Sequence, residues 1–245
     1  MKYQTAINNY LQKHSYPKIQ LKTVLFDMDG VLFDSMRYHA EAWHQTMVNL
    51  GTRFCKEEAY MHEGRTGAGT INIVFQREFQ RDATPEEIQN IYQNKSDIFN
   101  SYPDAEPMPG ARALLEKIKL LKLIPMVVTG SGQQSLLERL EQNFPNTFKP
   151  ELMVTAFDVK FGKPNPEPYL MALQKGGFKP HEAIVVENAP LGVEAGVAAG
   201  VFTVAVNTGP LDDKVLLDAG ADVLFHSMEE FEREWDGFYK ELTGY

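Results

Sequence analysis

The sequence predicts an α/β fold in which a parallel sheet carries helices on both faces and is interrupted by a helical insert. Short apolar runs alternate with helical patterns from Pro109 to the end of the chain, which is typical of strands buried on both faces. No strand-like run occurs between residues 36 and 107. Acidic and hydroxyl residues directly follow several apolar runs, and sheets of this kind bind ligands at that edge.

The chain before the first strand predicts a short helix over residues 4–13, which has one apolar face. Pro17 separates this helix from the strand. We therefore expect residues 1–20 to form a helical appendage that packs on the core.

The first strand, Val24-Leu25-Phe26, ends in two carboxylates, Asp27 and Asp29, followed by Gly30. Alternate residues of an extended chain share a face, so the two acids can point toward one spot. Two close carboxylates repel each other and require a cation or a proton. Short Asp/Gly clusters are usually solvated turns. The apolar run before this cluster and the helix after it favour an acidic site instead.

The segment that follows the first strand is predicted to be entirely helical. Residues 36–50 show apolar residues at steps of three and four, and Gly51 ends this helix. Thr84-Pro85-Glu86-Glu87 has the pattern of a capping box with proline in the first turn. Further helical patterns lie at residues 71–79 and 88–99. We expect a helical cap domain of residues 36–107, inserted into a core of residues 1–35 and 108–245.

The remainder of the chain alternates helices with strands. The expected strands are Ile124–Val128, Ile184–Val186, Phe202–Val206 and Val223–Phe225, with Leu152–Val154 as a possible further one. The expected helices centre on residues 114–121, 136–140, 169–173, 193–197, 216–217 and 228–242.

The composition limits the classes of function. A chain of 245 residues with 43% hydrophobic residues can bury a substantial core. Its net charge of −9 argues against a nucleic-acid partner, although a small phosphate ester needs only local positive charge. The single cysteine, Cys55, excludes an intrachain disulfide and favours a reducing compartment. No signal-peptide region or stretch of membrane-spanning length is present, so we expect a soluble, cytoplasmic monomer without membrane partners.

Thr129, Gly130 and Ser131 follow the second expected strand and precede a helix. Hydroxyls and free backbone N–H groups at such a place can hold an anion, and glycine permits its close approach. Taken alone, a Thr-Gly-Ser sequence is also common in ordinary loops that bind nothing.

Two more segments carry polar groups of interest. Lys163 lies in a loop with three prolines, which can present one ammonium group from a stiff backbone, although an isolated lysine there is more often on the surface. Glu187 and Asn188 follow the strand Ile184–Val186, where they bring acidic and amide oxygens to the same edge of the sheet.

The stretch Thr23–Ser35, TVLFDMDGVLFDS, resembles the DxDGxxxDS signature of the haloacid dehalogenase-like (HAD) phosphohydrolases, and the sequence through Trp43 looks like their beta-phosphoglucomutase-like branch. The resemblance implies a Rossmann-like core with a helical cap. It also implies a Mg²⁺-dependent phosphatase for a small phosphorylated metabolite, such as a sugar phosphate. Asp27 would form an aspartyl-phosphate and Asp29 would be the general acid and base. Asp34 and Ser35 are interpreted as helix N-caps.

The same resemblance implies roles for the other elements. Thr129, Gly130 and Ser131 would bind phosphoryl oxygens, and Lys163 matches the lysine of the family's GKPxPxxY element. The implied Mg²⁺ ligands are the side chain of Asp27, the backbone carbonyl of Asp29, and the pair at residues 187 and 188. The family usually has two acids at that pair. Because Asn188 is neutral, we expect weaker Mg²⁺ binding, with Glu187 acting directly or through water.

In the predicted cap, His39 and Trp43 match the first helix of the mutase branch. Arg65 could reach a second anionic group of a substrate, and a surface salt bridge is the equal alternative for it. On a lone helix Trp43 would pack in the core and His39 would lie at a solvated edge. The mutase pattern has a lysine where this chain has Glu63. A sugar-phosphate mutase is therefore the alternative function, and a non-catalytic phosphate-binding or regulatory protein is the alternative of another class, motivated by Asn188.

Overall fold

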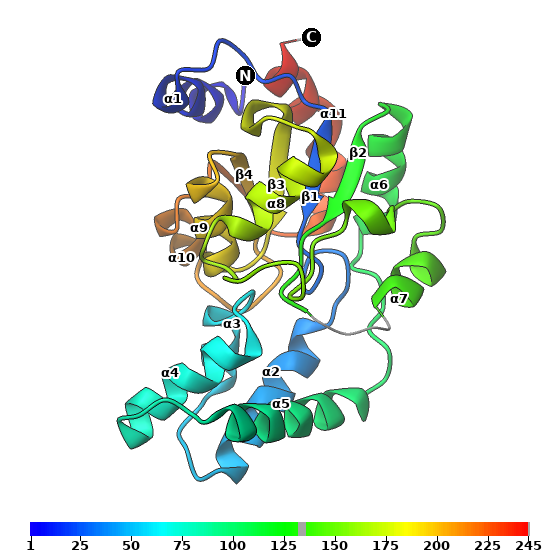
Figure 1. Cartoon of the computed structure of the whole chain (residues 1–245). Coiled ribbons are helices and arrows are strands. Elements are labelled where there is room, and N and C mark those ends of the chain that lie inside the picture. The colour runs from blue at the N-terminus through cyan, green and yellow to red at the C-terminus, as the bar shows by residue number, and fades with distance from the viewer. Residues whose placement is uncertain (132–135, 245) are drawn as a thin grey trace.

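A computed structural model describes residues 1–131 and 136–244, except for the side chains of residues 136 and 137. It contains an α/β core with a group of helices at one end (Figure 1). Within the described ranges, five parallel strands form one sheet in the order β2-β1-β3-β4-β5. Their bounds are β1 Thr23–Phe26, β2 Ile124–Val127, β3 Ala183–Glu187, β4 Phe202–Val206 and β5 Val223–Phe225.

Both faces of the sheet are covered, which explains why its strands are apolar throughout. In β1, Val24 and Phe26 join one apolar cluster and Leu25 joins another on the opposite face. The first cluster includes apolar residues of the helices α1 (Gln4–His14), α6 (Ala111–Leu120) and α11 (Met228–Thr243). The second includes those of the helices α8 (Glu167–Gly176) and α9 (Pro190–Ala198). β1 lies between β2 and β3, with Phe26 in register with Val127 and Val186. The carboxyl ends of these three strands therefore meet at one edge.

The helices agree closely with the expected pattern. The core helices are α1 Gln4–His14, α6 Ala111–Leu120, α7 Leu136–Asn143, α8 Glu167–Gly176, α9 Pro190–Ala198, α10 Asp213–Asp218 and α11 Met228–Thr243. The helices of the insert are α2 Met36–Asn49, α3 Lys56–Met61, α4 Gly67–Phe79 and α5 Pro85–Asn100. The capping box of α5 is confirmed, because the Thr84 side chain accepts from the backbone of Glu87 and the Glu87 carboxylate accepts from the backbone of Thr84.

Two local expectations differ from the structure, and one helix was not expected. The possible strand at Leu152–Val154 is wrong: Pro150–Leu152 is a 3₁₀ turn, and Val154 makes only an isolated bridge to Val128. Helix α3 had no apolar period long enough to be recognised. Ser35 precedes α2 but its side chain makes no capping hydrogen bond, because its hydroxyl is bound to Asp29.

The appendage packs on the core as expected. Tyr3, Ile7 and Tyr10 are buried in the same cluster as α11, and the backbone N–H groups of Lys2 and Tyr3 donate to the Glu241 carboxylate. Figure 1 shows both termini at the end of the core opposite the insert. No helix within the described ranges is long and apolar enough to cross a membrane.

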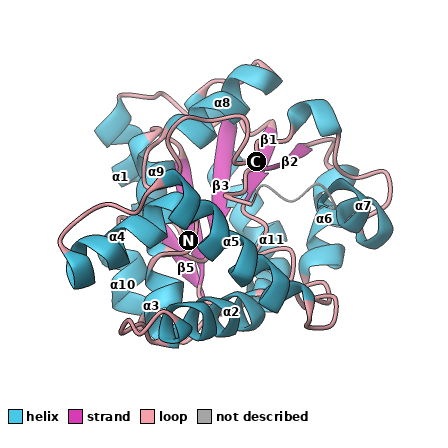
Figure 2. Ribbon diagram, turned by 60° about the horizontal axis from the view of Figure 1, so that its bottom comes forward, coloured by secondary structure: helices cyan, strands magenta, loops and turns pink. Residues whose placement is uncertain are grey.

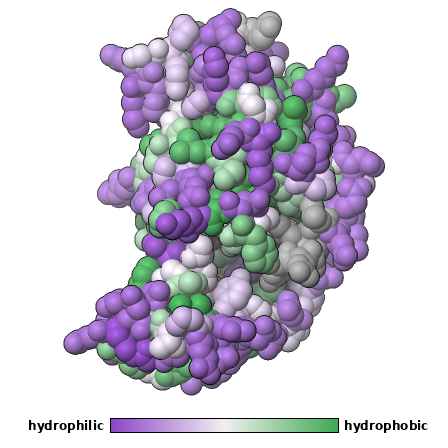
Figure 3. Space-filling model, viewed as in Figure 1, coloured by the Kyte–Doolittle hydropathy of each residue, from purple (hydrophilic) through white to green (hydrophobic). Residues whose placement is uncertain are grey.

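Helices α2 to α5 have an apolar cluster of their own, which includes Met47, Val74 and Ile91. They lie across the carboxyl edge of the sheet and form a separate lobe (Figures 2 and 3). The chain leaves and re-enters the core at neighbouring points, since Asp34 N donates to Glu106 O and Met108 N donates to Leu32 O. We keep residues 36–107 as the proposed bounds of a cap domain.

Candidate active site

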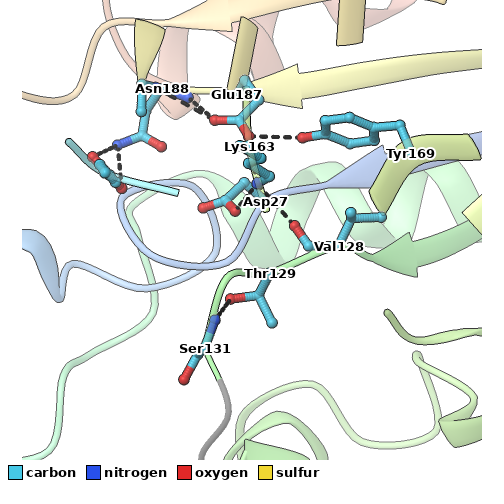
Figure 4. A network of polar contacts seen from close by, with 10 residues as sticks. Asp27, Val128, Thr129, Ser131, Lys163, Tyr169, Glu187 and Asn188 are labelled. Carbon is cyan, nitrogen blue, oxygen red and sulfur yellow. Dashed lines mark hydrogen bonds and ion pairs between the residues drawn. The ribbon is translucent and has the colours of Figure 1, made fainter. Parts of the chain in front are cut away.

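The carboxyl ends of three neighbouring strands bring the central polar residues together. Asp27 directly follows β1 and its N–H donates to Val186 O of β3. Thr129 lies just beyond β2, and Glu187 is the last residue of β3. Parallel pairing places these three side chains at one edge of the sheet (Figure 4).

Lys163 joins Asp27 and Glu187 in a buried charge cluster. Its ammonium group contacts Asp27 Oδ1 and donates to Glu187 Oε1 at 2.6 Å and to Val128 O at 3.0 Å. The lysine is only 1% exposed. Tyr169 OH donates to the same glutamate oxygen at 2.7 Å. The lysine thus compensates two carboxylates that would otherwise repel each other.

The pKa values within this cluster follow from burial and charge. Burial raises the pKa of Asp27 to about 7, although the neighbouring Lys163 opposes this shift. Burial lowers the pKa of Lys163, but the charges of Asp27 and Glu187 outweigh it and raise the pKa above its usual value. The ammonium form of Lys163 is therefore held firmly at neutral pH.

Asp29 belongs to a second network that extends into the cap. Its Oδ1 accepts from Ser35 Oγ at 2.5 Å and lies 3.3 Å from His39 Nε2. Lys95 Nζ of α5 lies 2.7 Å from His39 Nδ1. An ammonium can only donate, so Nδ1 of the neutral imidazole accepts from it and Nε2–H donates to Asp29. The imidazole ring also stacks on Phe99, with ring centroids 4.0 Å apart.

This network separates the pKa values of its members. Burial raises the pKa of Asp29, but the interactions with His39 and Ser35 outweigh it and hold the pKa well below its usual value. Burial and the charge of Lys95 lower the pKa of His39. Burial lowers the pKa of Lys95 to about 8. Asp29 is thus a carboxylate with its donors in place, which is the form that a general base requires.

The expected phosphate-binding residues lie on the loop after β2. Thr129 is 4% exposed, and its Oγ1 accepts from Ser131 N at 3.0 Å. A Cβ on Gly130 would lie 2.9 Å from Gly64 O of the cap, so the close contact between cap and core requires glycine here. All three predicted residues line the same cavity as Asp27.

Asn188 and Glu63 meet across the boundary between core and cap. The Asn188 amide Nδ2 lies 3.0 Å from each carboxylate oxygen of Glu63. Asn188 Oδ1 is buried and has no hydrogen-bond partner among the described residues, and it points toward Asp27 (Figure 4). Burial and the nearby Asp27 raise the pKa of Glu63 well above its usual value, against the hydrogen bond from Asn188.

The residues present fit a hard cation such as Mg²⁺. The described ranges contain no group of three or more His, Cys, Asp or Glu side chains suited to a metal. The expected set was Asp27, the Asp29 carbonyl, Asn188 and Glu187, the last directly or through water. The first three can hold such a cation without a further acidic side chain, with water completing an octahedron. The unpartnered Asn188 oxygen is the observation that supports this fit. Glu187 is held by other donors: Lys163 and Tyr169 at Oε1, and Asn188 N at Oε2.

The cavity above Asp27 lies between the core edge and the cap and has a volume of about 80 Å³. His39, Trp43 and Lys95 line it from the cap, as does Arg65 from the loop before α4. The Arg65 Nε atom is buried without a hydrogen-bond partner in the described part of the chain. His39 therefore lies inside the site rather than at a solvated edge.

Two residues of these networks were missed by sequence reasoning. Lys95 lies on the buried face of α5 between Ile91 and Phe99, so a lysine within an apolar stripe was the available signal. Tyr169 lies at the start of α8, where its place in an apolar helical pattern concealed the role of its hydroxyl. The sequence showed that Glu63 departs from the mutase pattern, but it did not show that Glu63 contacts Asn188.

Comparisons with known proteins agree with one another. The family model for haloacid dehalogenase-like hydrolases matches residues 24–206. Hexitol phosphatase A of Escherichia coli is 31% identical over 214 residues, which are 86% of this chain and 94% of that protein. The 2-deoxyglucose-6-phosphate phosphatase 1 of Saccharomyces cerevisiae is 32% identical over 81% of this chain and 84% of that protein. A solved structure from Bacteroides vulgatus, described as a putative beta-phosphoglucomutase, is 65% identical over 98% of both chains, with a TM-score of 0.96.

Proposed function

Because the chain belongs to the haloacid dehalogenase-like hydrolase family, we propose that it is a Mg²⁺-dependent phosphatase acting on a small phosphorylated metabolite, such as a sugar phosphate. The observation that carries this proposal is the position of Asp27, at the centre of the carboxyl edge, beside Lys163 and within one cavity with Thr129 and Ser131. A carboxylate can accept a phosphoryl group there, and the surrounding donors suit phosphoryl oxygens.

In the proposed reaction Asp27 attacks the phosphorus atom and the bond to the sugar oxygen breaks. Asp29, which is a carboxylate in the structure, would first take up a proton and then supply it to the leaving oxygen. Water then attacks the aspartyl-phosphate, with Asp29 as the base that takes its proton, and inorganic phosphate leaves. Thr129, Gly130 and Ser131 would hold the phosphoryl oxygens, and Lys163 would neutralise part of the charge. Mg²⁺, when bound by Asp27, Asp29 and Asn188, would supply further positive charge for the phosphoryl group.

The direct test is Asp27→Asn, assayed with hexitol phosphates and 2-deoxyglucose 6-phosphate, before and after chelator treatment. An amide is nearly isosteric with the carboxylate but is a poor phosphoryl acceptor, so we expect no measurable turnover and a retained fold by circular dichroism. Near-parent turnover by the variant would disprove the covalent mechanism. Full activity of the parent in excess chelator would disprove the role of Mg²⁺.

A sugar-phosphate mutase is the second candidate, favoured by the 65% identity to the Bacteroides vulgatus protein. The position of Glu63 favours the phosphatase, because its side chain lines the cavity and in its ionised form would repel the second phosphate that a mutase must handle. A coupled assay with a sugar 1-phosphate separates the two. Phosphate and metal binding without any turnover would favour the non-catalytic alternative.

The proposal includes a monomeric enzyme in the cytoplasm. Size-exclusion chromatography with light scattering tests the first part, and cell fractionation tests the second.

A further inference from the structure

The contact between Glu63 and Asn188 joins the cap to the core, and the proposed reaction steps give Glu63 no role. Glu63 comes from the cap, two residues after the end of α3, and Asn188 comes from the core, directly after β3. Both oxygens of the Glu63 carboxylate lie 3.0 Å from the same Asn188 amide nitrogen. Asn188 itself is 5% exposed. The contact is therefore a partly buried bridge between the two parts of the molecule.

The contact with Glu63 determines which atom of the Asn188 amide faces the carboxyl edge of the sheet. In its ionised form Glu63 can only accept hydrogen bonds, so the NH₂ group faces Glu63 and the Oδ1 atom faces the other way. That oxygen is buried and unpartnered within the described ranges, and it points toward Asp27 (Figure 4). A buried carbonyl oxygen without a donor is costly, and a cation beside Asp27 would remove that cost.

Three glycines make the bridge sterically possible. Gly30, at a φ of +80°, has no Cβ, and one placed there would lie 2.1 Å from Asn188 Nδ2. Gly64, at a φ of +81°, follows Glu63, and a Cβ there would lie 2.8 Å from Lys163 Cδ. Gly130 faces Gly64 O at a comparable distance. The cap loop thus fits against the core only because side chains are absent at these points.

We propose that Glu63 is a positioning residue of the metal site: it holds the Asn188 amide so that Oδ1 faces the cation, which makes cation binding depend on cap closure. The inference rests on the proposed Mg²⁺ dependence. It also explains the chemistry of the pair, since an amide at residue 188 can donate to Glu63 whereas an acid there would repel it. Residue 188, after β3, lacks the carboxylate that the family usually has there. Glu63 of the cap brings a carboxylate to the same place.

The test is a double-mutant cycle on Mn²⁺ affinity, measured by electron paramagnetic resonance on chelator-treated protein, so that no turnover is needed. Glu63→Ala should raise the Kd for Mn²⁺ about 10- to 100-fold, as loss of a supporting group typically does. In the Asn188→Asp background the same change should leave the Kd unchanged or lower it, because the donor is gone and two acids then face each other. Glu57→Ala is the matched control, because Glu57 is an exposed acid of α3, and it should not change the Kd.

Glu63→Gln keeps one acceptor oxygen and should give a Kd between those of the parent and Glu63→Ala; it carries the test if the alanine variant does not fold. An equal loss of affinity in both backgrounds would show a structural role and overturn the inference, and so would an unchanged Kd. In either case the Mg²⁺-dependent phosphatase would stand. If the folded parent bound no Mn²⁺, both the inference and the proposed metal dependence would fail.

Discussion

Two lysines are almost fully buried in the described structure, Lys163 in the core and Lys95 in the cap, with exposures of 1% and 4%. Lys163 contacts two carboxylates, Asp27 and Glu187, and its pKa is raised. Among the described residues, Lys95 has no carboxylate in contact and faces the neutral His39, and its pKa is lowered to about 8. The same residue type therefore has opposite properties, because its partners differ.

The two lysines belong to two networks of the site that are assembled differently. The cluster around Lys163 is complete within the core, so it does not depend on the position of the cap. The network through Lys95 and His39 reaches Asp29 only when α5 and α2 lie over the edge of the sheet. We infer that the core supplies the charge that an incoming phosphate meets, while the cap sets the state of the proton-transferring group.

The largest expected effect is that of Lys163→Met. Methionine fills similar space but leaves Asp27 and Glu187 facing each other without a counter-charge, and breaking a buried pair typically costs about 3–5 kcal/mol. Urea unfolding at pH 7 measures the loss, and turnover should also disappear. Lys22→Met is the control, because Lys22 pairs with Glu182 at 2.6 Å but is half exposed, so we expect less than about 1 kcal/mol. Equal losses in both variants would show that the buried cluster has no special energetic role.

Asp29→Asn tests the cap-dependent network. General acid–base help is worth about 10²–10⁴-fold, and we expect kcat to fall by that amount with the fold retained. Asp34→Asn is the matched control, since Asp34 is a more exposed acid of the same loop, paired with Arg37. A loss smaller than tenfold at Asp29 would assign the proton transfer to another group, with His39 the first to be examined.

Much of the core site could be predicted from the sequence, because in a parallel sheet the order of strands and their ends determine which side chains meet. Asp27, Thr129 and Glu187 each follow an apolar run, so their common edge followed from the strand assignment alone. The capping box of α5 was also predicted, because its signal is contained in four consecutive residues.

The cap side of the site could not be predicted in this way. Whether Lys95 is buried depends on how α5 packs over α2, which no local pattern specifies. The hydroxyl of Ser35 could cap a helix or bind Asp29, and only the tertiary arrangement decides. The pairing of Glu63 with Asn188 joins residues 125 positions apart, and each one taken alone gave only a departure from the expected pattern.

Lys95→Met tests the comparison of the two buried lysines through the pH dependence of the unfolding free energy. The pKa of Lys95 is about 8 in the folded protein, below its usual value, so the unfolded chain binds more protons and the parent gains stability as pH rises above 8. The methionine variant lacks this gain. The difference in unfolding free energy, variant minus parent, should therefore be largest at pH 7 and fall by up to about 3 kcal/mol by pH 10. Urea unfolding at both pH values measures it, and a difference independent of pH would show that Lys95 is not strained by burial.

The smallest expected effect is that of Tyr169→Phe, within the core cluster. Its hydroxyl donates to Glu187 Oε1 at 2.7 Å, but the same oxygen also accepts from Lys163, so the variant leaves no acceptor unpaired. We expect a loss of about 1–2 kcal/mol, well below that of Lys163→Met. Tyr10→Phe provides a comparison with a neutral acceptor, because Tyr10 OH donates to Gly200 O at 2.9 Å, and it should cost about 1 kcal/mol. A loss at Tyr169 as large as that at Lys163 would mean that the cluster is held together by hydrogen-bond geometry rather than by compensation of charge.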